Sequence, residues 1–174
     1  MLNHWNKLLA TECVVIGVGD HVVYPIFRVG YTTLMSVRDR QYVDEHIRQL
    51  KHIDIIIRDP EQRFISGVNR YCRENKLDLQ ESWSMIKKGK LIDRHFAPQY
   101  IWLLHLSKFY KGNVTLRPLE YIKKITKTHE NRSANKIDIP LIEEFTKIDK
   151  LLLKHQNNTV ALESIIRKYK NVLS

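Results

Sequence analysis

The sequence of 174 residues contains two cysteines, six glycines and five prolines, and it has no long apolar run. Cys13 and Cys72 lie far apart without a Cys-x-x-Cys pair or a histidine cluster, which argues against a zinc site or a disulfide framework. Nowhere do about eighteen apolar residues follow one another, and the N-terminal segment lacks the pattern of a signal peptide. We therefore expect a cytoplasmic protein or an excised catalytic domain, without a membrane segment.

Acidic residues are also scarce, since 19 Asp and Glu stand against 29 Lys and Arg, a formal net charge of +10. Such an excess attracts an anion or keeps the surface soluble. The basic residues are scattered along the chain, so charge alone favours neither nucleic acid, an acidic glycan, a membrane surface nor a nucleotide. The apolar share of 43% and the charged share of 28% are typical of globular proteins and predict one domain over residues 1–174.

Short apolar runs rich in β-branched residues predict the strands of this domain, at residues 13–18, 22–27, 52–57 and 113–117. Helices are predicted between and after them, from Pro60, over 79–90, over 98–109, near Pro118, and over 140–155 and 159–172. The alternation of strands and helices is typical of an α/β fold with a parallel sheet.

Two local details refine the predicted helices. The residues Leu34, Val37, Tyr42 and Ile47 recur at roughly helical spacing, which predicts one helix through that stretch. Asp59 can cap the next helix, whose first residue would be Pro60.

The loop after the second predicted strand has the composition of an anion site. It reads Arg28-Val29-Gly30-Tyr31-Thr32-Thr33, with a glycine turn before a helix, one guanidinium group and two hydroxyl groups. The loop is not a Walker A sequence, because it lacks the longer glycine-rich turn that ends in lysine. An ordinary strand-to-helix turn with an exposed arginine is the simpler alternative.

A second loop follows the strand at 52–57. Arg58 stands at the carboxyl end of that strand, and Ser66 follows eight residues later on the next helix. In a doubly wound sheet neighbouring strands end at one crevice, so the two loops could hold the two ends of one nucleotide. Alternatively Arg58 pairs with Asp59 or Glu61, and Ser66 is ordinary helix surface.

Three segments resemble the sulfotransferase superfamily, most closely the Golgi carbohydrate sulfotransferases and their bacterial and viral relatives. PIFRVGYTTL at 25–34 resembles the 5′-phosphosulfate loop of that family, and IRDPEQRFIS at 57–66 its 3′-phosphate motif. DRHFAPQ at 93–99 resembles the His-aromatic-x-Pro-Gln signature downstream. Asn131-Arg132-Ser133 loosely matches a polar loop that approaches the nucleotide.

The resemblance implies a P-loop-NTPase-like three-layer sandwich with a small central parallel sheet and C-terminal helices. It implies transfer of the sulfuryl group of 3′-phosphoadenosine 5′-phosphosulfate (PAPS) to a hydroxyl or amine of a carbohydrate or small molecule, without a metal. The implied nucleotide-binding residues are Arg28, Val29, Gly30, Tyr31, Thr32, Thr33, Arg58, Ser66, Arg132 and Ser133. Arg28 would stabilise the leaving 3′-phosphoadenosine 5′-phosphate (PAP), and His95 is the first candidate for the general base.

The sequence departs from this family at two points. Arg28 replaces the usual lysine, so the site keeps its charge but has a planar, less movable donor. The stretch between Thr33 and Arg58 is short, which leaves little room for the insertions that bind the acceptor in relatives. A partner copy of the chain could complete that cleft, so a homo-oligomer stays open.

Three alternatives remain at this level. A P-loop-like kinase would use ATP and magnesium, which the missing Walker lysine opposes. A basic module could bind nucleic acid or another polyanion, although no nucleic-acid-binding motif is present and no specific nucleic acid is expected. The chain could also be a degenerate sulfotransferase that binds PAPS without transferring its sulfuryl group.

Overall fold

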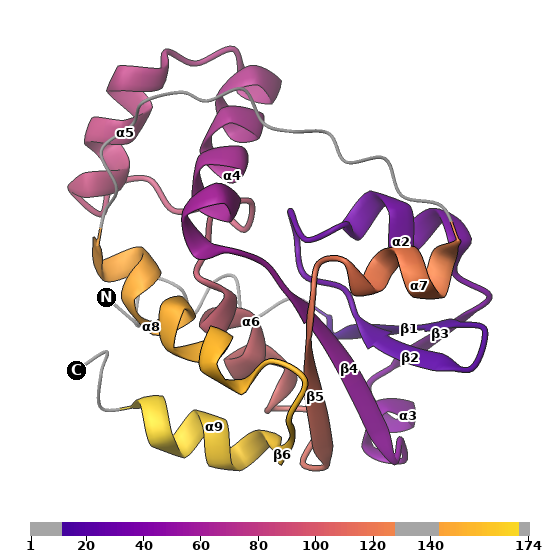
Figure 1. Cartoon of the computed structure of the whole chain (residues 1–174). Coiled ribbons are helices and arrows are strands. Elements are labelled where there is room, and N and C mark those ends of the chain that lie inside the picture. The colour runs from indigo at the N-terminus through magenta and orange to yellow at the C-terminus, as the bar shows by residue number, and fades with distance from the viewer. Residues whose placement is uncertain (1–11, 128–142, 171–174) are drawn as a thin grey trace.

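The computed structural model describes residues 12–127 and 143–170 (Figure 1). Six strands form one sheet, namely β1 (Val14–Val18), β2 (His21–Tyr24), β3 (Arg40–Val43), β4 (His52–Ile57), β5 (Asn113–Pro118) and β6 (Thr159–Ala161). The α-helices of the described residues are α2 (Tyr31–Val37), α3 (Glu45–Arg48), α4 (Pro60–Asn75), α5 (Leu79–Lys87), α6 (Gln99–Leu106), α7 (Tyr121–Thr126), α8 (Glu143–Leu152) and α9 (Leu162–Tyr169). A 3₁₀ turn, η2 (Leu153–His155), follows α8. The chain therefore has an α/β fold, as predicted.

The sheet has the strand order β3-β1-β2-β4-β5-β6 and is mixed. The three central strands β2, β4 and β5 are parallel, with Tyr24 opposite Ile55 and Ile55 opposite Leu116. The flanking strands β1, β3 and β6 are antiparallel to their neighbours. The predicted parallel sheet is thus present only at the centre, because β1 and β2 form a tight hairpin at Gly19 and cannot run in one direction.

The core lies where helices cover this sheet. β4 reads HIDIII and is buried along nearly its whole length, as expected of a central strand covered on both faces. In Figure 1, α2 and α7 lie together on one side of the sheet, and α6, α8 and α9 gather on the other. Buried side chains of both helix groups, among them Leu34, Ile122 and Leu103, join the strands in one apolar cluster.

Three predicted elements were wrong in detail. The helix after the first loop ends at Val37, and Tyr42 lies instead in β3, where it pairs with Val15 of β1. The predicted helix over 140–155 ends at Leu152 and continues only as the 3₁₀ turn η2. The predicted helix over 159–172 begins at Leu162, because Thr159–Ala161 pairs with β5 as an edge strand. In the strand cases, pairing with a distant partner outweighed the local helical pattern.

The start of α4 was predicted correctly. Asp59 is its N-cap, and its carboxylate accepts a hydrogen bond from the Gln62 backbone N–H at 2.8 Å. Pro60 is the first helical residue, where its missing N–H removes no helix hydrogen bond. This start fixes where the next two turns of α4, which carry Arg63 and Ser66, lie relative to the end of β4.

Candidate functional site

The first loop leaves β2 and turns sharply into α2. Arg28 has a φ of 65° and Gly30 a φ of 68°, so two of its residues adopt the left-handed conformation. A Cβ on Gly30 would lie 2.0 Å from Cδ1 of Ile122 in α7, so glycine serves both the conformation and the packing. A left-handed arginine costs on the order of 1 kcal/mol and persists only where its surroundings hold it.

The contact that holds Arg28 is made with Ser66 of α4. Nε and Nη2 of Arg28 donate hydrogen bonds to the Ser66 hydroxyl oxygen at 3.2 and 2.7 Å. Ser66 is 4% exposed, so it is not ordinary helix surface. The structure therefore brings together the two loops that the sequence analysis singled out.

Arg58 follows β4 directly and lies at the same edge of the parallel strands as the first loop. Its backbone is fixed by Gln99, whose Oε1 accepts from the Arg58 N–H at 2.8 Å and whose Nε2 donates to the Arg58 carbonyl at 2.9 Å. Its Nη2 donates weakly to Gln62 at 3.4 Å, while its Nε is buried without a hydrogen-bond partner. Burial lowers the pKa of Arg58, and Asp59 acts in the opposite direction. The Arg58 side chain thus has a buried donor unused.

Arg63 is a third guanidinium group at this site, and the sequence analysis missed it. Its side chain is 1% exposed, its Nε donates to the Phe27 carbonyl at 3.1 Å, and its Nη1 donates to the Ala97 carbonyl. Its Nη2 is buried without a partner. Burial lowers its pKa to about 10, and Asp149 acts in the opposite direction. Arg63 therefore links the first loop to the segment 93–99 and leaves one donor unused.

The positive charges at this site repel one another. The pKa of Arg28 is lowered first by burial and then by the charges of Arg70, Arg58 and Arg73, while Glu74 acts in the opposite direction. Arg28 and Arg58 in turn lower the pKa of Arg63. A buried cation without an equal countercharge is costly, and a bound anion next to these groups would relieve that cost. The arrangement is typical of a site for a highly charged anion.

His95 lies next to Phe27, the residue before Arg28, and between two carboxylates. Its Nδ1 is 2.6 Å from Oδ1 of Asp93, which also accepts from the His95 backbone N–H at 2.8 Å. Its Nε2 is 3.6 Å from Oε2 of Glu74. Burial acts to raise the pKa of Asp93, but the hydrogen bonds from His95 outweigh it and hold that pKa below its ordinary value. With Nδ1–H donated to Asp93, Nε2 is the nitrogen that can accept a proton.

The position of His95 depends on a close approach to α4. A Cβ on Gly67 would lie 2.1 Å from the His95 carbonyl oxygen and 3.0 Å from Cα of Phe96. The segment around His95 therefore packs directly on the α4 backbone, one residue after Ser66. This contact brings a histidine far along the chain next to the helix that carries Ser66.

An aromatic group lies next to the first loop. The Phe27 ring is stacked with Tyr31 at a centroid distance of 4.3 Å and with Trp102 at 5.3 Å. The guanidinium carbon of Arg94 lies 4.7 Å from the Phe27 ring centroid, and the His95 ring meets Phe27 edge-on. Because Phe27 precedes Arg28, this stack packs against the start of the first loop.

The remaining predicted site residues have different outcomes. Val29 is buried in the core, Tyr31 and Thr33 are half-buried, and Thr32 is exposed in the first turn of α2. Arg132 and Ser133 lie outside the described residues.

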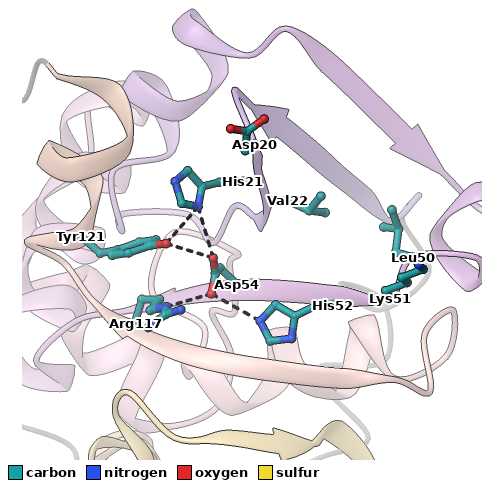
Figure 2. Close-up of a pocket in the computed structure, with 9 residues that line it drawn as sticks. All are labelled: Asp20, His21, Val22, Leu50, Lys51, His52, Asp54, Arg117 and Tyr121. Carbon is teal, nitrogen blue, oxygen red and sulfur yellow. Dashed lines mark hydrogen bonds and ion pairs between the residues drawn. The ribbon is translucent and has the colours of Figure 1, made fainter.

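A pocket of about 370 Å³ lies elsewhere, around Asp54 (Figure 2). Asp54 is 4% exposed and accepts hydrogen bonds from Arg117 Nε at 2.8 Å and from the Tyr121 hydroxyl at 3.2 Å. His52 and His21 lie 3.5 and 3.8 Å from its two oxygens. Asp54 precedes Arg58 by four strand residues, roughly 13 Å. Its partners already compensate its charge, so we interpret this cluster as a buried polar network and not as the site.

Two residues that act on the site come from late in the sequence. Gln99 lies in the segment 93–99, but no sequence pattern predicts that its side chain bonds to the backbone of Arg58. Asp149 of α8 accepts hydrogen bonds from the backbone N–H groups of Gln99 and Tyr100. An isolated acidic residue on an amphipathic helix looks like surface, so only the tertiary structure could identify it.

No protein-family model matches the chain, and searches of curated proteins and of solved structures found no match either. Within residues 12–127 and 143–170, no group of three or more His, Cys, Asp or Glu side chains is arranged to hold a metal ion. None of the helices in the described ranges is long and apolar enough to cross a bilayer.

Proposed function

We propose that this chain is a PAPS-dependent sulfotransferase domain with a P-loop-like α/β core. The observation that carries the proposal is the convergence of Arg28, Arg58 and Arg63 at the carboxyl ends of two adjacent parallel strands. Two of these guanidinium groups have a buried nitrogen without a partner. Ligands of open α/β sheets bind at this edge, and a nucleotide with two separate phosphate-bearing ends matches several cations that lie close together.

The residues divide between the two ends of that nucleotide. Arg58 and Ser66 would hold the 3′-phosphate, with the free Nε of Arg58 as a donor. Arg28, with the backbone N–H groups of Gly30 to Thr33, would hold the 5′-phosphosulfate, while the Val29 N–H already donates to the Ile26 carbonyl at 3.2 Å. Nη2 of Arg28 lies 2.7 Å from the Ser66 hydroxyl oxygen, so the groups proposed for the two ends of the nucleotide are in direct contact. This division uses residues that lie together in the folded chain.

The chemical step requires stabilisation of charge on the leaving group. As the acceptor oxygen or nitrogen bonds to sulfur, the bond between sulfur and the bridging phosphate oxygen breaks, and PAP leaves with the electron pair. Arg28 would stabilise that charge, as cationic side chains do in phosphoryl transfer. The contact with Ser66 and the left-handed backbone restrict Arg28, which reduces the reorganisation needed during transfer.

His95 is the proposed general base. Asp93 holds the Nδ1 side of the ring, so Nε2 is available to take the proton of the acceptor. Glu74, 3.6 Å from Nε2, is 38% exposed in its side chain and would be displaced by an acceptor. The neighbouring aromatic stack of Phe27, Tyr31 and Trp102 offers a flat surface of the kind that sugar rings and other small acceptors pack against.

Nucleotide binding tests the proposal most directly. We expect PAP to raise the melting temperature without magnesium, and ATP with magnesium to have little effect. Arg58→Ala should weaken PAP binding by about 10- to 100-fold, as expected for the loss of a charged hydrogen bond. The matched control is Arg48→Ala, an exposed arginine of α3, which should leave PAP binding unchanged.

A transfer assay with labelled PAPS over a panel of alcohols, sugars and amines then identifies the acceptor. PAP binding without transfer to any member of the panel would favour a PAPS-binding domain that has lost its activity. Unchanged PAP binding in Arg58→Ala, or equal stabilisation by ATP with magnesium, would refute the proposed function.

A further inference from the structure

Gln99 connects the site to the helices on the other side of the sheet. Its side chain is fully buried and makes two hydrogen bonds to the backbone of Arg58, one to the N–H and one to the carbonyl. These bonds occupy the positions that a neighbouring strand would use if β4 continued. The direction in which Arg58 leaves the strand therefore depends on Gln99.

Asp149 holds Gln99 in turn. Its Oδ2 accepts the Gln99 backbone N–H at 2.6 Å, and its Oδ1 accepts the Tyr100 N–H at 2.9 Å. The Gln99 side-chain nitrogen is also 3.5 Å from Oδ2. The carboxylate thus satisfies the first two N–H groups of α6, which has no side-chain cap of its own. Asp149 of α8 fixes the start of α6, and Gln99 at that start fixes Arg58.

Asp149 is buried, and among charged groups Arg63 is the one that compensates its negative charge. Asp149 is 2% exposed, and burial raises its pKa to about 6, against the opposing effects of Arg63 and of the hydrogen bonds from Gln99 and Tyr100. Between α8 and α4, Glu61 and Lys150 pair with each other at 2.7 Å. The carboxylate therefore changes its protonation state just below neutral pH, and the protonated form can no longer accept both N–H groups equally well.

We propose that Asp149 and Gln99 are positioning residues for Arg58, and that protonation of Asp149 loosens this loop and weakens anion binding there. Asp149 acts through Gln99 and does not touch the anion. The anion site rests on the proposed function, but the link from Asp149 to Arg58 can be measured without any ligand.

Hydrogen exchange at the Arg58 amide measures that link, because this N–H donates to Gln99. After correction for the intrinsic effect of pH, we expect protection of this amide to fall about tenfold between pH 7.5 and pH 5. In Asp149→Asn it should be low at both pH values. The amide of Ile55, inside β4, reports the stability of the sheet and should keep its protection in both proteins.

Gln99→Met provides a second variant if Asp149→Asn does not fold, since it removes both bonds to Arg58 and keeps the backbone N–H groups for Asp149. It should likewise give low protection of Arg58 at both pH values. Constant Arg58 protection across pH in the unaltered protein, or an equal loss at Ile55, would overturn the inference.

Binding of inorganic sulfate and of PAP, each at pH 7.5 and pH 5, separates the inference from the proposed function. Sulfate keeps its charge over this range, so its affinity should fall about fivefold to tenfold in the unaltered protein relative to the change in Asp149→Asn. If sulfate follows this pattern and PAP does not bind, the inference stands and the sulfotransferase assignment fails. If PAP binds and neither anion depends on Asp149, the assignment stands and the inference fails.

Discussion

Arg28 and Ser66, 38 positions apart in the chain, are joined by two hydrogen bonds from one guanidinium group to one hydroxyl oxygen. The pair connects the loop after β2 with the first turns of α4, the two places where anion-binding residues were predicted. It also places a partly buried arginine against a small neutral group, although an acidic partner would have compensated its charge better. This choice of partner leaves the charge of Arg28 available to a ligand.

Removal of the Ser66 hydroxyl should weaken nucleotide binding. In Ser66→Ala the Nε and Nη2 groups of Arg28 lose their acceptor, so Arg28 samples other positions and must be ordered by the ligand. The loss of one such contact, about 1 kcal/mol, corresponds to a roughly fivefold to tenfold higher Kd for PAP, measurable by calorimetry. Ser164→Ala, at an exposed serine of α9, is the control and should bind PAP normally. An unaltered Kd in Ser66→Ala would show that Ser66 neither binds the 3′-phosphate nor supports Arg28.

A methyl group at position 67 should destabilise the fold. Gly67→Ala places a Cβ 2.1 Å from the His95 carbonyl oxygen. The contacted atom belongs to the backbone and cannot move aside like the end of a side chain, so the chain must shift. We expect the free energy of unfolding in urea to drop by about 2–4 kcal/mol. Gly19→Ala is the matched control, since Gly19 has a φ of 55° but no heavy atom within 4 Å of its added Cβ, and it should cost about 1 kcal/mol. Equal losses in the two variants would mean that the His95 segment does not pack tightly on α4.

The proposed base should matter for transfer and not for binding. His95→Gln keeps a hydrogen-bonding side chain of similar length but cannot take up the acceptor proton, so single-turnover transfer from labelled PAPS should slow by about 10²- to 10⁴-fold. The Kd for PAP should change by less than about twofold, because no phosphate contact is assigned to His95. His46→Gln, at an exposed histidine of α3, should transfer normally. Full transfer activity in His95→Gln would leave His95 with a structural role only.

The stability of the protein should carry a pH signature of Asp149. Its pKa is raised from 3.8 to about 6, so the folded chain binds this proton more tightly than the unfolded chain. The stabilisation is therefore complete below about pH 4 and is lost as the pH rises through 6, by up to about 3 kcal/mol. The free energy of unfolding of the unaltered protein, minus that of Asp149→Asn, should fall by this amount from pH 4 to pH 7. A difference that is constant over this range would contradict the raised pKa.

Several parts of the fold were predictable because their signals are local. The four apolar runs became strands, and Asp59 with Pro60 fixed the start of α4. The strand β3 was missed because Tyr42 continues the roughly helical spacing of Leu34 and Val37, and its strand conformation depends on pairing with β1. The strand β6 was missed for the same reason, since only three residues pair with the edge of β5.

The sequence by itself determined which residues can bind an anion, because the order of a strand, a turn and a helix with Arg28, or with Arg58 and Ser66, is written in consecutive residues. Only the tertiary structure decided that these loops meet at one edge of the sheet, and that the buried Arg63 and Asp149 lie beside them. The physical reason is that burial sets the strength of a charge, and burial arises from elements far apart in the chain. A guanidinium group or carboxylate that looks like solvated surface in the sequence becomes a strong electrostatic group once the folded chain removes it from water.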